Sequence, residues 1–201
     1  MKKIKKGRPK TFSKINAEEI AMNVYWKEGI DNVSLNEICR KIGESKPSVY
    51  REYGGDEGLK LSALNLYLEK RVGTLSKLLS EKNFFLESLQ YTFDYLINSH
   101  FENGNGYPCM FNRESWFPST NLPLSCKNII KAKDEEIYDK LKNLILRAIE
   151  KKEILTDLDI DTFTSFIHHQ LKLIATLSNK NISRKILNEM VVLIMDPLKK
   201  N

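Results

Sequence analysis

The first segment of the chain carries an unbroken run of positive charge. Seven cationic side chains precede the first acidic residue, Glu18, and these are Lys2, Lys3, Lys5, Lys6, Arg8, Lys10 and Lys14. Charge of one sign concentrated in this way suits a polyanion, either a nucleic acid or an acidic membrane surface. A solubilising tail that binds no partner is the alternative interpretation of the same residues.

Small polar and basic residues surround a glycine-containing turn further along the chain. The turn, Gly43-Glu44-Ser45, joins two short segments with helical spacing of apolar residues, and Lys46, Ser48 and Arg51 follow it. A helix that begins with such residues can enter the major groove of DNA, and its free amides and dipole favour phosphates. The spacing and the basic arm together predict a DNA-binding helix-turn-helix, with a generic three-helix packing unit as the alternative.

Residue patterns typical of catalysis or metal binding are not found. The sequence has no Gly-rich phosphate loop, no nucleophile elbow and no H-E-x-x-H motif. Cys39, Cys109 and Cys126 are widely spaced and form no C-x-x-C pair, and the neighbouring His168 and His169 point in different directions on a helix. We therefore expect no enzyme activity, no cofactor, no metal site and no disulfide framework.

The composition is that of an ordinary globular protein with an uneven charge distribution. Of 201 residues, 41% are hydrophobic and 29% are charged, and the formal net charge is +6. Residues 1–72 hold 15 Lys and Arg against 10 Asp and Glu, so most of the excess lies in the first third. No apolar run reaches the ~18 residues that a membrane span needs, and no apolar segment follows the basic N-terminus as in a signal peptide. We expect a cytoplasmic protein without a membrane partner.

Helical periodicity extends from one end of the chain to the other, and strand patterns are nearly absent. The first predicted helix begins at an N-cap, Asn16, and ends at Gly29, and the second begins at Ser34 with Glu37 completing a capping box. The third begins at Ser45, and its inner face includes Tyr50. The sequence predicts an all-α protein of about nine helices, with boundaries near 16–29, 34–43, 46–52, 56–80, 84–102, 109–117, 125–152, 159–177 and 183–195.

Four motifs in residues 8–64 resemble the DNA-binding region of the TetR/AcrR family of bacterial transcriptional regulators. The segment Gly7-Arg8-Pro9-Lys10 resembles the basic entry of that family, and residues 25–30 resemble the end of its first helix. Residues 34–38 resemble the start of its second helix, and residues 43–53 its turn and recognition helix. The motifs cover under a third of the chain, and beyond them the chain matches the family only in helix number and length.

The resemblance implies a three-part organisation and a set of phosphate contacts. The parts are a basic arm over 1–14, a helix-turn-helix domain over 15–55, and a helical effector-binding and dimerisation domain over 56–201. Lys10 belongs to the arm, Ser34 caps the second helix and touches a phosphate, and Tyr50 packs while its hydroxyl reaches a phosphate. Where the family usually has a phosphate-binding Lys, this chain has Asp56, which favours a helix N-cap but repels the DNA backbone.

The resemblance also implies which residues lie at the DNA groove. Ser45 and Lys46 are expected at the groove entrance, and Pro47, Ser48 and Arg51 face the bases. Palindromic operator DNA and a two-fold homodimer follow from the same resemblance. Repression, rather than activation, is the usual mode of the family. An architectural or RNA-binding helical protein without an effector is the alternative.

The C-terminal helices of the family hold a ligand pocket, and this chain has many aromatic side chains in the corresponding region. The resemblance favours a small, largely apolar effector, whose identity the residues do not give. The expected ligand-binding residues are Tyr91, Tyr95, Cys109, Phe111, Trp116, Phe117 and His168. Ordinary core packing is the alternative for each aromatic and for His168, and a redox- or electrophile-sensing thiol is an alternative use of Cys109.

The last two helices carry more apolar residues than one small domain needs. In the family such helices pair with those of a second subunit as a four-helix bundle. The expected dimer-interface residues are Phe163, Ile167, Leu171, Ile174, Met190, Val191 and Ile194.

Overall fold

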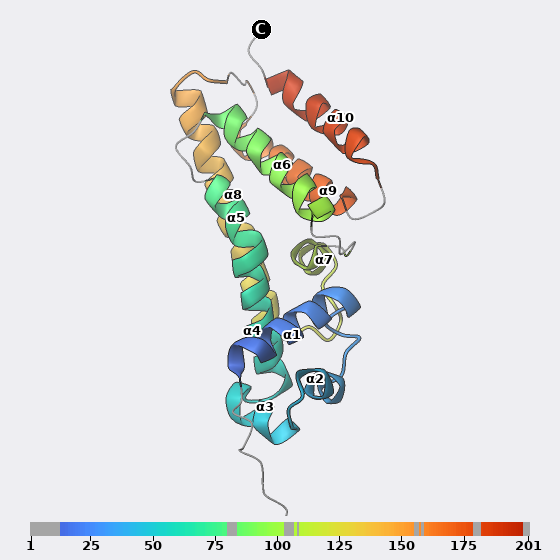
Figure 1. Ribbon diagram of the computed structural model, residues 1–201. Coiled ribbons are helices and arrows are strands. Elements are labelled where there is room, and N and C mark those ends of the chain that lie inside the picture. Colours follow the sequence, from blue (N-terminus) through green and yellow to red (C-terminus); the bar gives the residue numbers. More distant parts are fainter. Residues whose placement is uncertain are drawn as a thin grey trace, which may run out of the picture.

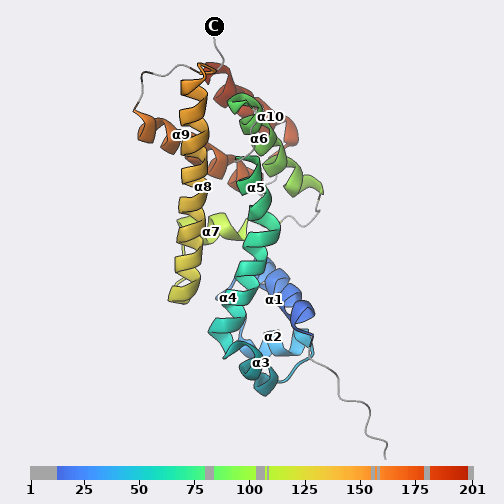
Figure 2. The same ribbon diagram turned by 90° about the vertical axis from the view of Figure 1, so that its left-hand side faces the viewer.

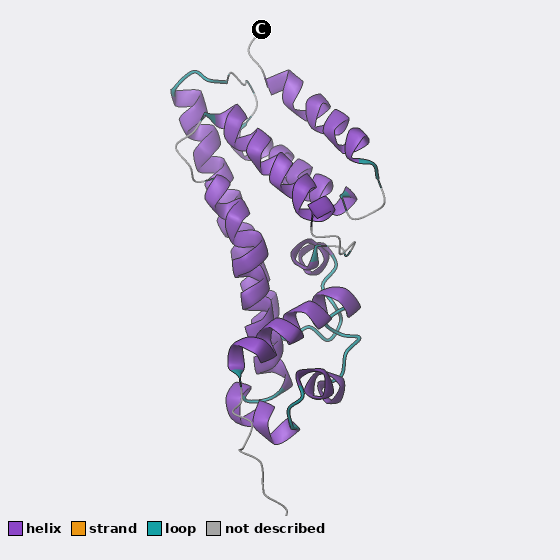
Figure 3. Ribbon diagram, viewed as in Figure 1, coloured by secondary structure: helices purple, strands orange, loops and turns teal. Residues whose placement is uncertain are grey.

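The computed structural model describes residues 13–79, 84–102, 107, 109–154, 157, 159–178 and 182–198. All regular secondary structure in these residues is helical (Figure 3). Residues 1–12 of the basic arm, including Lys10, lie outside the described residues, as does most of the loop before Cys109. The predicted all-α fold is confirmed for the part of the chain that the structure describes.

Three short helices form the lower end of the molecule in Figure 1. They are α1 (Lys14–Glu28), α2 (Leu35–Ile42) and α3 (Lys46–Tyr53). Helices α1 and α3 pack against the first helix segment that follows, α1 most extensively, and α2 packs on α1 and α3. The small domain therefore shares its core with the helix that leads into the rest of the molecule.

The long helix that follows consists of three consecutive segments, α4 (Asp56–Tyr67), the π-helical turn η1 (Leu68–Val72) and α5 (Gly73–Leu78). The periodicity predicted one helix over this range with Gly73 as a weak point, and the π turn ends beside that glycine. A π turn inserts an extra residue into the helix and leaves one carbonyl to find another donor. Here the hydroxyl of Tyr95 donates to the carbonyl of Arg71 at 2.8 Å.

The remaining helices form the upper part of the molecule (Figure 2). They are α6 (Phe85–Glu102), α7 (Met110–Trp116), α8 (Leu124–Glu150), α9 (Ile160–Leu177), α10 (Arg184–Met195) and the short 3-10 turn η2 (Asp196–Leu198). Helix α8 runs beside α4 and α5, α9 packs on α6 and α8, and α7 lies between the two parts of the molecule. No helix among the described residues is long and apolar enough to cross a membrane.

The predicted helix boundaries agree with the structure within a few residues, but the residue predicted to cap the first helix is wrong. Asn16 is not its N-cap, because α1 begins two residues earlier and Ser13 occupies the cap position. The prediction relied on the side-chain chemistry of Asn16, but the backbone amide of Ala17 already bonds to the carbonyl of Ser13 at 3.0 Å. Its C-terminal end is as expected, since Gly29 ends the helix with φ 93°.

A glycine holds α3 and α4 in close contact. A Cβ atom built on Gly58 would lie 1.7 Å from the carbonyl oxygen of Tyr53, a distance that no side chain can occupy. A Cβ atom built on Gly73, fifteen residues further along the same long helix, would have its nearest neighbouring atom at 3.9 Å. Of these two glycines, only Gly58 is therefore required by packing, and it fixes the approach of α3 to α4.

Candidate nucleic-acid interface and sensor cavity

The second helix begins with a complete capping box. The hydroxyl of Ser34 accepts a hydrogen bond from the amide of Glu37 at 3.3 Å, and the Glu37 carboxylate accepts one from the amide of Ser34 at 3.0 Å. These hydrogen bonds lower the pKa of Glu37, first through the backbone amide and then through the hydroxyl of Ser34. Gly43 ends the helix in the left-handed conformation (φ 77°), which sets the tight turn.

The third helix presents its N-terminal residues to solvent. Ser45 is its N-cap and accepts from the amide of Ser48 at 3.3 Å, and Pro47 lies in the first turn, where proline is tolerated. Ser45, Lys46, Pro47 and Arg51 are exposed, and Val49 is fully buried beneath them. Among the described residues, no carboxylate forms an ion pair with Lys46 or Arg51, so both charges are available to an external anion.

Tyr50 lies on the surface of the recognition helix, where the prediction placed it on the inner face. Its side chain is 56% exposed, and its ring lies against the backbone of Gly55. The apolar core ends at Val49 because the chain turns away at Gly54-Gly55, which leaves no helix to cover Tyr50. The hydroxyl is consequently accessible, as a phosphate contact requires.

The charge of Asp56 is offset within the chain. Gly55, not Asp56, occupies the N-cap of α4, so the expected capping role is wrong. The carboxylate instead pairs with Lys60, one turn later, at 2.8 Å. This pairing reduces the repulsion that an unpaired acid would exert on a DNA backbone.

A small cavity of about 50 Å³ lies between the long helix and helices α6 to α9. Arg71, Cys109, Phe111 and His168 line it together with Val72, Leu75, Leu96, Asn112, Ile137, Leu171, Lys172 and Ala175. Of the expected ligand residues, the structure brings Cys109, Phe111 and His168 together here. Tyr67, which is buried, donates from its hydroxyl to the Sγ of Cys109 at 3.5 Å and accepts from the amide of Met110.

The other expected ligand residues lie outside this cavity. Tyr91 is on the exposed face of α6 and Phe117 is 76% exposed after α7, so neither faces the cavity. Tyr95 binds the π turn through its hydroxyl, and Trp116 lies beside the ammonium group of Lys172 at 5.5 Å from its ring centroid. The aromatic composition therefore did not by itself identify the residues that line the cavity.

A buried polar cluster borders the cavity. Asp134 on α8 receives Nε2 of His168 at 3.2 Å and Nζ of Lys172 at 2.9 Å, and Ser115 contacts both Asp134 and Lys172. Burial raises the pKa of Asp134, but hydrogen bonds from His168 and Lys172 outweigh it and bring the pKa to about 2. Sequence reasoning missed Asp134 and Lys172, because an acid on α8 and a base on α9 share no motif.

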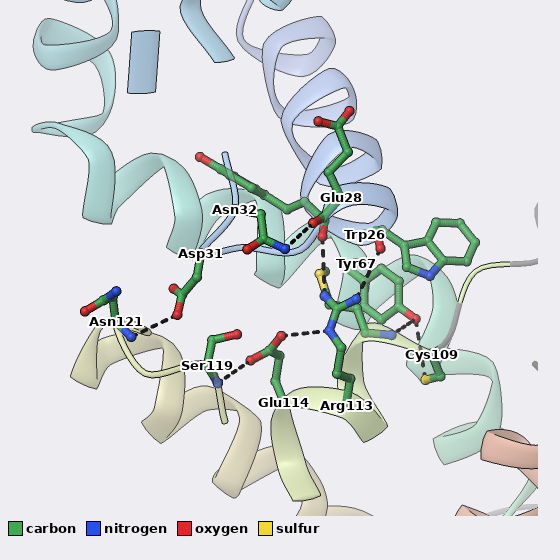
Figure 4. Close-up of polar contacts among 12 residues, drawn as sticks. Trp26, Glu28, Asp31, Asn32, Tyr67, Cys109, Arg113, Glu114, Ser119 and Asn121 are labelled. Atoms are coloured by element: carbon green, nitrogen blue, oxygen red, sulfur yellow. Dashed lines mark hydrogen bonds and ion pairs between the residues drawn. The ribbon is translucent and has the colours of Figure 1, made fainter. Parts of the chain in front are cut away.

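Helix α7 also contacts the C-terminal turn of α1 (Figure 4). The guanidinium of Arg113 donates to the carbonyls of Tyr25 and Trp26, each at 3.4 Å, and its Nε pairs with the buried carboxylate of Glu114 at 3.0 Å. From the π turn, the guanidinium of Arg71 stacks on the Trp26 ring at 4.7 Å from its centroid. Two arginines from the larger domain thus hold the end of α1.

The loops beside this contact are also bonded to each other. In Figure 4 the amide of Asn121 points to Asp31, and the structure gives a hydrogen bond of 2.9 Å between them. The amide of Ser119 donates to the second oxygen of Glu114 at 2.9 Å. The segment between α7 and α8 is consequently tied both to α7 and to the loop after α1.

Most of the expected dimer-interface residues are buried within the single chain. Phe163, Ile167, Leu171, Ile174 and Val191 are at most 4% exposed, and Ile194 is 9% exposed. Helix α9 packs on α6 and α8, and α10 packs on α6 and α9, so these side chains face the interior of this chain. Met190 is partly buried, and the exposed apolar residues on the same helices are Phe166, Ile186, Val192 and Leu193.

Helix order, the capped helix-turn-helix and the helical larger domain define the fold of the TetR family of transcriptional regulators. Solved structures of that family superpose on most of the chain. A cysteine mutant of the TetR family regulator CifR, complexed with 26-bp double-strand operator DNA, has a TM-score of 0.78 at 20% identity and covers 94% of this chain and 98% of its own. The transcriptional regulator FadR from Bacillus subtilis, in complex with stearoyl-CoA, has a TM-score of 0.70 at 14% identity with the same coverage.

Sequence relatives are also helix-turn-helix regulators, although no family model matches the chain. The transcriptional repressor ComR of Escherichia coli K12 is 32% identical over 65 residues, which is 32% of this chain and 31% of ComR. The repressor BdcR of the same strain is 28% identical over 104 residues, 52% of this chain and 53% of BdcR. The matched segments therefore span about a third and about half of these two repressors.

Proposed function

We propose that this protein is a sequence-specific DNA-binding transcriptional regulator, in which α3 enters the major groove. The observation that carries the proposal is the exposed N-terminal half of α3, where Lys46 and Arg51 lie beside small polar residues on a helix fixed by Ser45. The operator complex of the structurally similar CifR supports the same use of the fold. We propose a cytoplasmic location for the same reason, because an operator-binding protein works where the DNA is.

Operator binding is tested by footprinting on the DNA that flanks the coding region, followed by titration over a range of salt concentrations. Each phosphate neutralised contributes about −0.9 to the slope of log K against log salt. Arg51→Ala should cost about 1–3 kcal/mol per half-site and relax specificity if Arg51 reads a guanine. Lys185→Ala, an exposed cation on α10, is the matched control and should bind as the wild type does.

A protein that binds random duplex, or RNA, as tightly as any flanking sequence would be an architectural or RNA-binding protein instead. Deletion of residues 1–10 separates positioning from readout. It should weaken binding to every sequence about equally and flatten the salt slope, because arm contacts to phosphates carry no sequence information. A changed operator preference would instead mean that the arm reads a minor groove.

The regulator acts as a homodimer that uses the exposed apolar faces of α9 and α10. Leu193 is 74% exposed, and Val192, Ile186 and Phe166 lie exposed on the same two helices. Two-fold pairing of such a face matches two half-sites of a palindromic operator. Sedimentation at micromolar concentration should show a dimer that Leu193→Glu converts to a monomer, whereas Phe117→Glu, equally exposed but after α7, leaves it intact.

The effector is a small, largely apolar molecule that releases the protein from its operator, which makes the protein a repressor. The position of the cavity supports this proposal. Ten of its lining residues belong either to helices that hold α1 or to helices that pack against those. Its 50 Å³ is far below the ~300–1,000 Å³ of ligand pockets, so an effector must enlarge it and move those helices. An effector shifts the equilibrium only if it binds this enlarged form better.

Effector release is tested by a thermal-shift screen of apolar compounds, followed by operator titration with each compound that raises the melting temperature. Phe111→Ala should change the response to such a compound while leaving operator affinity nearly intact, because Phe111 is buried in the larger domain. Tyr91→Ala, exposed on α6, is the control. If no compound alters operator binding, the protein binds its operator constitutively.

A further inference from the structure

We infer that the cavity takes a molecule with an apolar body and an anionic group, such as a carboxylate, and that Arg71 binds the anion. The inference rests on the effector proposal for the location of the site, and it adds the chemical class of the ligand. Eight of the lining residues are apolar or a thiol, namely Val72, Leu75, Leu96, Cys109, Phe111, Ile137, Leu171 and Ala175. They suit the body of the ligand.

The charged groups of the cavity are of one sign. The charged side chains in its lining are Arg71 and Lys172, and none of the described lining residues is acidic. The nearest carboxylate, Asp134, is already occupied, because His168, Lys172 and Ser115 bind its two oxygens. A cationic ligand would therefore find no carboxylate in the lining, whereas an anion would meet the guanidinium of Arg71, whose charge no described carboxylate pairs with.

Arg71 is the cation best placed to bind an incoming anion. Its guanidinium stacks on Trp26, and among the described residues no carboxylate lies within ion-pair distance of it. Lys172, by contrast, already donates to Ser115 and Asp134. A guanidinium presents a planar fork of donors that fits a carboxylate with two hydrogen bonds.

Binding at Arg71 also acts directly on the small domain. The Trp26 ring under the guanidinium of Arg71 belongs to the last turn of α1. Arg113 holds the same turn by donating to its backbone carbonyls. An anion that draws Arg71 towards the cavity weakens its stacking on Trp26. The ligand therefore loosens one of the two arginine contacts that position the helix-turn-helix.

The two tryptophans of the chain make this binding measurable. Each has a cation of the cavity over its ring, Arg71 on Trp26 at 4.7 Å and Lys172 on Trp116 at 5.5 Å. Movement of either cation changes the surroundings of one indole. The variant Trp116→Phe leaves only the Trp26 signal, and Trp26→Phe leaves only that of Trp116.

The experiment titrates the full chain, without DNA, with octanoate, 1-octanol and octylamine below their aggregation concentrations. Trp emission and melting temperature are followed together. We expect octanoate to bind at least ten-fold more tightly than 1-octanol, and octylamine to bind more weakly than either. In the Trp116→Phe protein, octanoate should change the remaining emission.

Variants test the role of Arg71. Arg71→Gln should lower the affinity for octanoate at least ten-fold and change that for 1-octanol little. Arg71→Lys keeps the charge and should retain part of the preference for octanoate over 1-octanol. Lys77→Gln, an exposed cation on α5 outside the cavity, is the matched control and should match the wild type. Melting curves of each variant confirm that it is folded.

Equal affinity for octanoate and 1-octanol, tighter binding of octylamine, or the absence of octanoate binding would overturn the inference. Because the assay contains no DNA, its outcome is separate from that of the regulator proposal. Selective octanoate binding by a protein that recognises no operator would leave the anion site standing and contradict the regulator. Operator binding by a protein without anion selectivity would support the regulator and overturn the anion site.

Discussion

The helix-turn-helix and the larger domain are stabilised by contacts of different range along the chain. In the smaller unit, the polar bonds that set α2 and α3 join residues three apart, as in Ser34 with Glu37 and Ser45 with Ser48. In the larger domain, Lys172 bonds to Asp134, and Arg113 reaches Tyr25 and Trp26 some ninety residues away. Local motifs thus define the surface proposed to bind DNA, whereas long-range contacts define the cavity and its connection to α1.

The largest expected effect contrasts two glycines of the long helix, one beside the helix-turn-helix and one further into the larger domain. Gly58→Ala should destabilise the protein by about 3 kcal/mol or more, because its Cβ would overlap the carbonyl of Tyr53. Gly73→Ala has room and helical backbone, so it should be neutral or stabilising by up to about 1 kcal/mol. Urea unfolding of both variants measures the difference, and similar midpoints would show that α3 can shift away from α4.

The next effect tests the buried cluster of the larger domain. Asp134→Asn should cost about 2–3 kcal/mol, because it leaves the buried Lys172 without its counter-charge, although Asp134 itself is 26% exposed. The pKa of Asp134 is about 2 when folded and about 3.9 when unfolded, so its ionisation adds about 2 kcal/mol above pH 4. This contribution falls as the pH drops from 4 towards 2.

Acid titration of unfolding checks this assignment. The difference in free energy of unfolding between wild type and Asp134→Asn should be constant from pH 7 to 5 and shrink between pH 4 and 2. Hydrogen bonds from Lys133, Ser76 and Lys140 also bring the pKa of Glu136 to about 2. Glu136 is present in both proteins, so its contribution cancels in the difference. A difference that stays unchanged at pH 2 would assign the effect to packing instead of charge.

A smaller effect compares equivalent caps in the two regions. Ser34→Ala on α2 and Ser183→Ala on α10 each remove one side-chain bond to a helix amide, and each should cost about 1 kcal/mol of stability. Only Ser34→Ala should also weaken operator binding, because α2 packs against the proposed recognition helix and α10 does not. Equal operator affinities for the two variants would mean that the cap does not position α3.

The smallest expected effect concerns the thiol at the cavity. Cys109→Ser should change stability by less than about 1 kcal/mol, since the hydroxyl can still accept from Tyr67. Operator binding before and after diamide treatment should be the same in wild type and variant. Release of the wild type alone by diamide would instead favour thiol sensing through Cys109 over ligand binding.

The sequence predicted those parts of the fold whose determinants are neighbours in the chain. The capping box at Ser34, the turn at Gly43 and the cap at Ser45 are where the residue types placed them. The N-cap assigned to Asn16 was wrong because α1 begins after Ser13, whose side chain makes no capping hydrogen bond, so cap chemistry did not mark this helix start. Tyr50 was placed inward by its spacing, but the turn at Gly54-Gly55 leaves it uncovered.

The amino-acid sequence by itself determined an all-helical chain with a capped helix-turn-helix near its start, because helix caps, turns and periodicity depend on residues within a few positions of one another. Only the tertiary structure decided that Phe163 and Ile167 fill the core of this chain, that Arg71 and Lys172 line one cavity, and that Asp134 pairs with Lys172. Burial and charge pairing depend on which helix faces cover each other, and residues about forty to a hundred positions apart carry no local signal of that arrangement.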